Sequence, residues 1–386
     1  MSEWKCYKLN EISSLSNGIN FDKSAYTSGV KLISVSDFKN RIHPDYDLLQ
    51  EVDSKVVRSG DYLEKGDIVF VRSNGNKELV GRCMMIDRDI PVTYSGFCIK
   101  LRLKDKKLFE PVFFNYLFRT RQFKKSMTGT AVGANIQNLS QSRLGNCEVN
   151  VPDIETQREI ATILSRYDSL IENYQKQIEL LEEAAQRLYK EWFVDLNFPG
   201  HENTKIVDGV PEGWEKKKVG DMISKIQRTK QVTANNYQAS GKIPVIDQSR
   251  NYIAGYTDDA ECLVQVTVPY IVFGDHTRIL KYIPFSFAKG ADGTQLVMSN
   301  DLERMPQSLF YNSLIEIDLS NYSYARHFKY LKEEFVLLPS EYVARKYDSI
   351  VSKYYQSIHR SREQIRLLTE ARDRLLPKLM SEEIEV

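Results

Sequence analysis

The sequence lacks the motifs that mark most nucleotide-dependent, metal-dependent and hydrolytic enzymes. It contains no GxGxxG after a strand, no Walker A loop, no HExxH and no GxSxG. The Asn/Asp-Pro-Pro-aromatic motif of DNA amino-methyltransferases is also missing. Asp275 and His276 could be imagined as an acid/base pair, but neighbouring residues at a strand exit usually point apart. These absences favour a binding function over a catalytic one.

Cysteine is scarce, and apolar runs are short. The five cysteines form no CxxC pair and leave an odd number, which argues against a zinc site or a disulfide framework and favours a reducing compartment. The first residues lack the apolar core of a signal peptide, and no apolar run approaches the length that spans a membrane. We therefore expect a cytoplasmic, soluble chain with no membrane partner.

A large charge of one sign is absent as well. The net charge is +1, but residues 1–150 carry an excess of +6 and residues 151–200 one of −5, whereas 201–340 and 341–386 stand at −1 and +1. Only the first segment has the positive excess of a polyanion-binding surface, and it is weak.

What the sequence does contain is a long apolar seam at heptad spacing. From residue 160 to residue 188 apolar side chains recur in steps of four and three with no proline or glycine between, which predicts a helix that packs on another helix. A second helix of the same phase follows 187 residues later, so that Ile171 corresponds to Ile358. Each is about 40 residues and about 60 Å long, and we expect the two to pair. At Ser361 and Arg372 the second seam turns polar, which either fixes the register or marks where a third helix docks.

The repeat extends beyond the helices. The pattern W-x-x-x-K-(L/V)-x-(D/E) opens at Trp4 and again at Trp214, and residues 113–117 match residues 310–314. The order of these anchors is kept while their offset falls from 210 to 187, so duplication followed by divergence is the simplest account.

Each half is therefore predicted to be a globular unit of mixed structure followed by one long helix. The predicted boundaries are 1–152 and 197–339 for the two globular units, and 153–196 and 340–380 for the two helices. Strands are expected at 67–71, 99–103 and 270–273, a short helix at 111–123, and strands that end at Pro152 and Pro339. The fold class is α+β, with the helices paired as an antiparallel coiled coil and a pseudo-twofold internal repeat.

This plan resembles the specificity subunit of type I restriction-modification systems. The resemblance covers essentially the whole chain and rests on the two W-x-x-x-K-(L/V) openings, on 149–152 followed by 155–161, and on 72–75, 274–278 and 184–188. The chain departs from the family where Ala344 replaces the usual glutamine after the strand-ending proline.

The resemblance implies a DNA-recognition function without catalysis. Each globular unit would be a target recognition domain that reads one half of an asymmetric bipartite site. The coiled coil would be the spacer and the dock for two methyltransferase subunits, and two restriction subunits would join the complex. S-adenosylmethionine would belong to the methyltransferase partner, and ATP and magnesium to the restriction partner, so the chain itself would bind no cofactor.

Polar loops in the two globular units are the candidate DNA contacts. Arginine, asparagine and glutamine can make bidentate bonds to guanine and adenine, although any exposed loop is rich in such residues. The candidates in the first unit are Arg72, Asn74, Asn76, Lys77, Asn135, Gln137 and Asn138, and those in the second are His276, Thr277, Arg278, Thr294 and Gln295.

Two other functions stay open from the residues alone. One is the specificity chain of a type IIB-like restriction system, which cuts on both sides of its site and shares this plan. The other is a non-catalytic coiled-coil scaffold whose globular ends bind proteins, a reading that the weak charge of the second unit keeps open.

Overall fold

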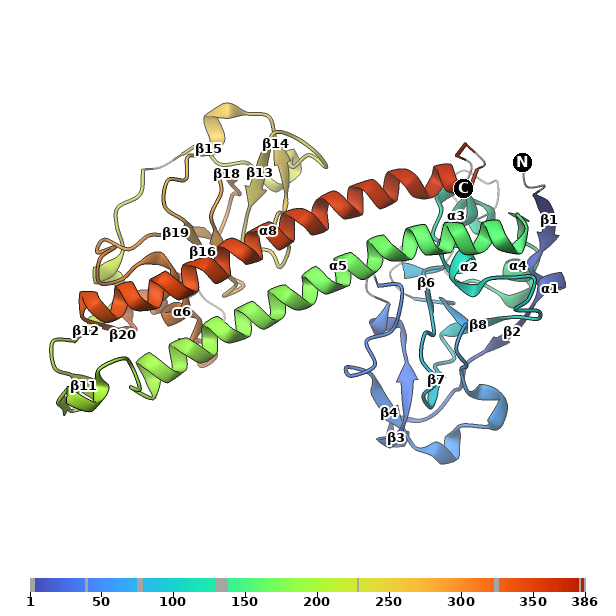
Figure 1. The fold of residues 1–386 in the computed structure, drawn as a ribbon, viewed down its shortest axis with the longest axis horizontal. Coiled ribbons are helices and arrows are strands. Elements are labelled where there is room, and N and C mark those ends of the chain that lie inside the picture. The colour runs from blue at the N-terminus through green and yellow to red at the C-terminus, as the bar shows by residue number, and fades with distance from the viewer. Residues whose placement is uncertain are drawn as a thin grey trace. The chain divides into compact units, whose positions relative to one another are not determined.

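The computed structural model describes residues 4–38, 41–74, 79–128, 138–227, 229–322, 326–381 and 383–384. The chain divides into two compact units (Figure 1). Unit 1 combines Met1–Glu172 with Arg366–Val386, and unit 2 is Asn173–Ile365. Each unit therefore contains part of both long helices.

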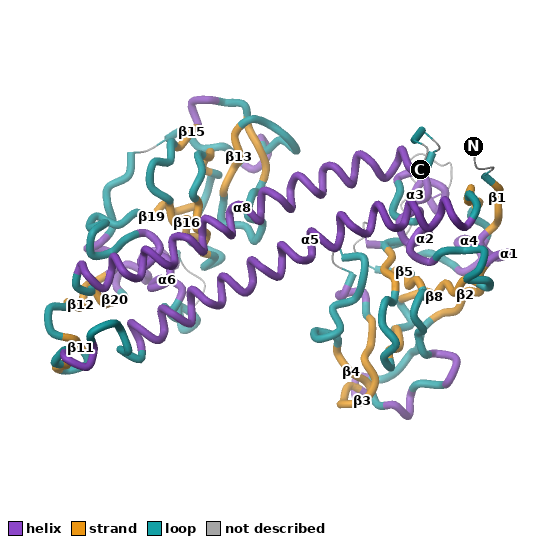
Figure 2. The backbone as a smooth tube through the Cα atoms, in the orientation of Figure 1, coloured by secondary structure: helices purple, strands orange, loops and turns teal. Residues whose placement is uncertain are grey.

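The two long helices are α5 (Ile154–Tyr189), which continues as a π-helical turn over Lys190–Val194, and α8 (Glu341–Leu379). Figure 2 draws each as an unbroken coil. The Asp153 carboxylate accepts a hydrogen bond from the Thr156 amide at 2.9 Å and so satisfies one of the free donors at the start of α5. The prediction of a mixed α/β protein with two long helices is confirmed.

Unit 1 is built from three small sheets and short helices. A four-stranded antiparallel sheet has the order β2-β8-β5-β6, a three-stranded sheet has the order β4-β3-β7 with β3 and β7 parallel, and β1 pairs with β9. The strands are β1 (Lys5–Lys8), β2 (Ser13–Asn17), β3 (Tyr26–Ile33), β4 (Gln50–Val52), β5 (Ile68–Val71), β6 (Cys83–Met85), β7 (Val92–Tyr94), β8 (Cys98–Leu103) and β9 (Glu148–Val151). The helices are α1 (Leu9–Ile12), α2 (Pro111–Leu117), α3 (Arg121–Thr128) and α4 (Gln141–Gly145).

The structure divides the helix expected over 111–123 into α2 and α3. Proline at the first position and Glu110 as its cap begin α2. The Thr120 hydroxyl donates to the Leu117 carbonyl at 2.7 Å and accepts from the Phe123 amide at 3.2 Å, so it ends one helix and caps the next. The break turns α3 to a new direction.

The beginning of α5 and the end of α8 complete the core of unit 1. Ile160 and Leu164 of α5 are buried in the same apolar cluster as Leu379 and Met380 of α8. Asp168, which is 5% exposed, forms an ion pair with Arg372 and accepts a hydrogen bond from the Tyr116 hydroxyl. The polar position of the second heptad seam, Arg372, therefore pairs with a buried carboxylate of unit 1.

Unit 2 has the same kinds of parts. Its sheets have the orders β14-β13-β18-β15 and β17-β16-β19, and two further pairs are β12 with β20 and β10 with β11. The strands are β10 (Ile206–Val207), β11 (Val210–Pro211), β12 (Glu215–Lys218), β13 (Ile243–Ile246), β14 (Gly255–Thr257), β15 (Leu263–Val264), β16 (Tyr270–Gly274), β17 (Leu280–Ile283), β18 (Phe287–Lys289), β19 (Thr294–Val297) and β20 (Phe335–Leu338). The helices are α6 (Gln307–Ile315) and α7 (His327–Glu333).

In unit 2 the end of α5 contacts the beginning of α8. The Tyr347 hydroxyl donates to the carbonyl of the buried Ala185 at 3.3 Å, and the Tyr347 ring lies 5.1 Å from the Phe193 ring. Arg362 forms an ion pair with Glu182 at 2.8 Å. Aromatic packing thus takes the place that a buried ion pair has in unit 1.

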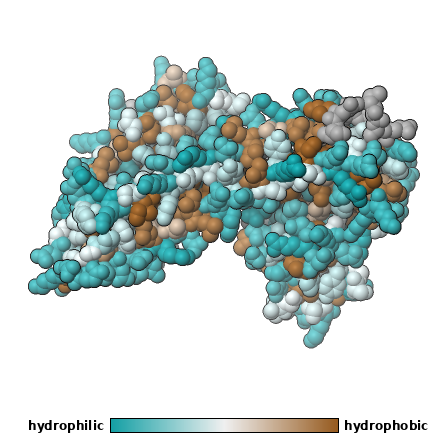
Figure 3. All heavy atoms as spheres, in the orientation of Figure 1, coloured by the Kyte–Doolittle hydropathy of each residue, from teal (hydrophilic) through white to brown (hydrophobic). Residues whose placement is uncertain are grey.

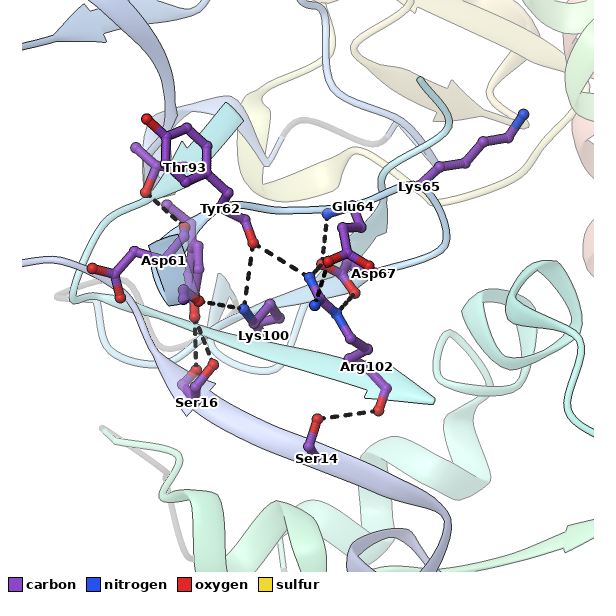
Figure 4. A network of polar contacts seen from close by, with 12 residues as sticks. Ser14, Ser16, Asp61, Tyr62, Glu64, Lys65, Asp67, Thr93, Lys100 and Arg102 are labelled. Carbon is purple, nitrogen blue, oxygen red and sulfur yellow. Dashed lines mark hydrogen bonds and ion pairs between the residues drawn. The ribbon is translucent and has the colours of Figure 1, made fainter. Parts of the chain in front are cut away.

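A buried polar network fixes the central strands of unit 1 (Figure 4). Asp67, 1% exposed, lies just before β5 and accepts two hydrogen bonds of 2.7 Å from Arg102 of β8. Nearby, Lys100 donates to the Gly60 carbonyl at 2.9 Å, and burial lowers its pKa. Bidentate Arg–carboxylate pairs are strong when they are shielded from water, so this pair sets the position of β5 beside β8.

The face of the molecule drawn in Figure 3 is mainly hydrophilic, with scattered apolar side chains. Among the described residues, no helix has the length and apolar character needed to cross a membrane. All five cysteines are free thiols.

We predict that Asp67→Ala lowers the free energy of unfolding by about 3 kcal/mol, because it leaves a largely buried guanidinium without its main partner. The matched control is Glu64→Ala, which removes another carboxylate 2.7 Å from Arg102 that is 60% exposed, and we expect it to cost under about 1 kcal/mol. Urea unfolding of the three chains measures both effects. Equal losses from the two substitutions would contradict the assignment.

Candidate nucleic-acid interface

Four segments of unit 1 meet where its strands end, and backbone hydrogen bonds join them. We call residues 18–20, 72–73, 94–97 and 138–139 the loop frame of unit 1. The bonds run from Ile19 N to Tyr94 O (2.9 Å), Gly96 N to Ile19 O (2.7 Å), Arg72 N to Phe97 O (2.7 Å) and Leu139 N to Arg72 O (2.7 Å). Because backbone groups make these bonds, most side chains of the frame can differ without breaking them.

Unit 2 has the same bonds in the same order. We call residues 232, 275–276, 289–293 and 327 the loop frame of unit 2. Its bonds run from Val232 N to Lys289 O (3.0 Å), Ala291 N to Val232 O (2.8 Å), Asp275 N to Gly293 O (2.7 Å) and His327 N to Asp275 O (2.9 Å). The strands that lead in, β5 and β16, share the buried run Ile-Val-Phe. Two different loop sequences are thus held on one backbone plan.

Close backbone approaches explain some of the glycines in these frames. A Cβ atom at Gly18 would lie 2.2 Å from the Tyr94 carbonyl oxygen, and one at Gly290 would lie 2.4 Å from the Tyr237 hydroxyl. Only glycine fits at such distances. The glycines therefore allow the segments of each frame to approach one another closely.

The structure brings together two of the predicted contact residues of unit 1. Arg72 directly follows β5, is half-buried and donates to the Gly96 carbonyl at 3.3 Å. Asn138 is exposed and lies beside it, because Ser73 and Asn138 form an isolated β-bridge. Asn74 is half-buried and follows in the same loop. Asn76, Lys77, Asn135 and Gln137 lie outside the described residues.

The predicted residues of unit 2 are more scattered. His276 and Thr277 are exposed at the loop frame. Arg278 has a left-handed backbone (φ 61°), and its guanidinium donates to the Leu319 carbonyl at 3.0 Å. Thr294 is buried and Gln295 is half-buried, and both lie in β19. His276, Thr277 and Arg278 are therefore the exposed residues of the predicted set, and the Arg278 guanidinium is bound to the Leu319 carbonyl.

Gln248, which the sequence analysis missed, joins three loops of unit 2. Its side-chain oxygen accepts from the His276 amide at 3.0 Å, and its side-chain nitrogen donates to the Asp292 carbonyl at 3.0 Å. Its own carbonyl accepts from the Thr277 hydroxyl at 2.6 Å. The signal that could have found it is the polar turn directly after β13, because polar loops at strand ends are where the other candidate contacts lie.

Phe97 is a second residue that sequence reasoning missed. Its carbonyl accepts from the Arg72 amide, so its backbone is fixed, yet its side chain is 62% exposed. Single exposed aromatics are common on protein surfaces. This one lies in a rigid turn beside Arg72, where an apolar ring could contact a thymine methyl group.

Asp275 and His276 lie in different environments. Asp275 is buried, and its carboxylate accepts from the Phe328 amide at 2.8 Å, whereas the His276 side chain is exposed. The position that follows the buried strand is therefore a cation in unit 1, Arg72, and a buried anion in unit 2. No group of three or more His, Cys, Asp or Glu side chains in the described segments could bind a metal ion.

A buried lysine supports the turn that carries Gln248. Lys281 of β17 is 5% exposed and donates to the carbonyls of Asp247 at 2.8 Å and Asn251 at 2.5 Å. Burial lowers its pKa to about 8, although the Asp247 carboxylate acts in the opposite direction. The 247–251 turn is therefore held by a group that is close to losing its proton near neutral pH.

We predict a pH-dependent contribution from Lys281. The pKa of Lys281 is about 8 in the folded chain, and its ordinary value, which applies in the unfolded chain, is 10.5. Between these two pH values the unfolded chain binds more protons, so the free energy of unfolding increases as the pH rises. Relative to Lys281→Met, the free energy of unfolding should rise by about 3 kcal/mol across this window. Urea unfolding of both chains at neutral pH and near pH 10 measures the difference. Parallel pH profiles would contradict it.

Relatives of known type match this chain over much of its length. Residues 1–183 match the family model described as type I restriction modification DNA specificity domain. The MjaIX specificity subunit of Methanocaldococcus jannaschii, a type I restriction enzyme subunit, is 27% identical over 299 residues, which is 70% of this chain and 68% of that protein. The HindI specificity subunit of Haemophilus influenzae is 28% identical over 204 residues, covering 51% of this chain and 42% of that protein.

A solved structure shares the fold. The crystal structure of the type I restriction-modification S subunit from M. genitalium aligns with a TM-score of 0.62 and 17% sequence identity, covering 98% of this chain and 96% of that one. Identity at this level supports the fold alone, while the sequence relatives carry the resemblance to the family. Residues 1–183 thus resemble a type I restriction-modification DNA specificity domain, and the chain as a whole is similar to type I restriction enzyme specificity subunits.

Proposed function

We propose that the chain reads an asymmetric DNA site in two halves, one with each globular unit. The observation that carries this proposal is the loop frame, which recurs bond for bond in both units but holds different side chains. A shared frame places the reading residues in equivalent positions, and different residues read different bases. Residues 1–152 and 197–339 are the two target recognition domains in this proposal.

The chemistry at each frame suits groups that protrude into a DNA groove. In unit 1 the Arg72 guanidinium can make paired bonds to guanine, the Asn138 amide can pair with adenine, and the Phe97 ring can contact a thymine methyl. In unit 2 His276 and Thr277 are exposed, and Gln248 holds their loop in place. The weak net charge of this unit means that phosphate contacts supply little of its affinity.

The two long helices, 153–196 and 340–380, are proposed to pair as an antiparallel coiled coil that separates the two readers. The Asp168–Arg372 pair in unit 1 and the Glu182–Arg362 pair in unit 2 support this arrangement. A pseudo-twofold repeat is further supported by the strands before the helices, since Lys5 pairs with Val151 as Glu215 pairs with Leu338. Half-sites about 34 Å apart, one turn of DNA, would then lie on one face of the duplex.

The chain is proposed to be the non-catalytic subunit of a cytoplasmic complex. The coiled coil would dock two methyltransferase subunits, which hold S-adenosylmethionine and take the flipped adenine. Two restriction subunits would bring ATP and magnesium.

The experiment that tests the proposal is a genome-wide map of methyladenine in cells that express the chain with its methyltransferase, compared with cells that express the methyltransferase alone. We expect a new two-part motif with a fixed gap. A stable complex of the two chains that produces no new motif would contradict DNA reading and favour the scaffold function.

Substitutions in one frame should change one half of that motif. We predict that Arg72→Ala relaxes selection at one half-site and His276→Ala at the other, each by about tenfold at the base that is contacted. The control is Lys217→Ala, which removes a cation of β12 that pairs with Glu215 at 3.2 Å, and it should leave the motif unchanged. Relaxation of both halves by a single substitution would contradict the division of labour.

The spacer function predicts a longer gap when both helices are lengthened together. Seven residues inserted after Glu172 and seven after Ile365, where the two units divide, add two turns or about 10 Å and keep the heptad phase. The gap between half-sites should grow by about three base pairs, as read from the methylation map. An active complex with an unchanged gap would refute the spacer function.

A further inference from the structure

Unit 1 contains a cavity of about 760 Å³ that the proposed DNA reading does not use. It lies between the α2–α3 junction and the helices α5 and α8 of the same unit. Its lining residues are Ile42, Tyr116, Arg119, Thr120, Arg121, Gln122, Lys124, Asp168, Arg372, Asp373, Leu376, Pro377 and Met380. This volume is within the range of small-molecule sites, about 300–1,000 Å³.

Part of the cavity lining carries cations whose side chains have no hydrogen-bond or ion-pair partner among the described residues. Neither the Arg121 nor the Lys124 side chain forms a hydrogen bond or an ion pair in the described part of the chain. Arg119 uses one terminal nitrogen to donate to the carbonyls of Arg41 and Cys83, at 2.6 and 3.0 Å. Its Nε atom is buried without a hydrogen-bond partner among the described residues. Hydrogen-bond donors of this kind can bind an anion that enters the cavity.

The two carboxylates in the lining do not neutralise these cations. Asp168 and Asp373 both form ion pairs with Arg372, and Asp168 also accepts from the Tyr116 hydroxyl. Burial and the Asp168 charge raise the pKa of Tyr116 and keep it a hydrogen-bond donor. The cations of α3 therefore leave the cavity with positive charge.

Another part of the lining is apolar. Leu376, Pro377 and Met380 come from the end of α8, and Ile42 adds to them. A ligand that satisfies both parts of the lining has an anionic group at one end and an apolar or aromatic body at the other.

The corresponding place in unit 2 is filled by protein. By the offsets of 197 and 187 residues, Glu316 replaces Arg119, Tyr355 replaces Asp168 and Ala185 replaces Arg372. Tyr355 is buried, stacks on Tyr282 at 4.5 Å and donates to the Asn312 side chain at 3.0 Å. The helix pair thus closes on aromatic rings in unit 2, whereas in unit 1 it borders an open, cationic cavity.

We propose that this cavity of unit 1 binds a phosphorylated small molecule of nucleotide size. Arg121, Lys124 and the free nitrogens of Arg119 would hold its phosphates, since guanidinium and ammonium groups are the side chains that bind phosphate best. Its base or other ring would lie against Leu376, Pro377 and Met380. Because Asp168 and Arg372 join α5 to α8 at the edge of the cavity, a bound ligand would contact the joint between the two helices.

The test is titration of the purified full chain with ATP, AMP and adenosine by calorimetry, without magnesium and without DNA. We expect ATP to bind more tightly than AMP and adenosine to bind least. The double variant Arg121→Ala/Lys124→Ala should weaken ATP binding by at least about tenfold, because it removes two charge-assisted contacts. Lys125→Ala, which removes a neighbouring cation of α3 that is not part of the lining, is the matched control and should change binding less than about twofold.

A second variant distinguishes binding inside the cavity from attraction of ATP to positive charge on the surface. Gln122→Trp keeps every cation and fills part of the space, so it should also abolish ATP binding. Equal binding of adenosine and ATP, no binding of ATP by the folded chain, or loss of binding in the Lys125→Ala control would overturn the proposal.

Binding of duplex DNA has to be measured as well, because DNA also presents phosphates. If Arg121 and Lys124 bind DNA instead, the double variant will reduce DNA affinity and flatten its dependence on salt, and DNA will displace ATP. That result would overturn the small-molecule site. DNA reading by the loop frames would still be tested separately by the methylation map.

Discussion

The structure depends on two helices that each belong to two cores. Unit 1 is not a contiguous segment of chain, because Leu379 and Met380 from the far end of the sequence lie in its apolar cluster. Unit 2 likewise needs Ala185 and Tyr189 from the helix that begins in unit 1. The Asp168–Arg372 pair fixes one of these junctions, and the burial of Tyr347 against Ala185 fixes the other. Lengthening one of the two helices alone would therefore shift its residues out of one of these cores.

The loop frames show how one backbone plan can carry unlike surfaces. All eight defining bonds are between backbone groups, so loop side chains can change without loss of the frame. The position that follows the buried strand shows how different these side chains can be, since it is Arg72 in unit 1 and the buried Asp275 in unit 2. The charge at this position therefore differs between the units although the pattern of backbone hydrogen bonds is the same.

Sequence reasoning predicted the long helices well because a heptad seam and a constant offset are strong periodic signals. It also placed β5, β8 and β16, whose apolar runs are flanked by polar turns. It missed the break at Thr120, because a hydroxyl that caps a helix looks like any other polar residue within an amphipathic run. Gln248 and the burial of Thr294 depend on which strands are neighbours, and no spacing reveals that. The polar seam position Arg372 was recognised, but its partner Asp168 lies 204 residues away and only the fold brings them together.

Equivalent positions of the two frames are proposed to contact different halves of one DNA site. The most direct measurement places a photo-crosslinking benzophenone amino acid at position 73 or at position 276, in the complex with methyltransferase and duplex DNA that carries the methylated motif, and maps the crosslinked bases. The account predicts crosslinks from position 73 in one half-site and from position 276 in the other. Crosslinks from both positions in the same half, or none from a complex that binds the DNA, would contradict it.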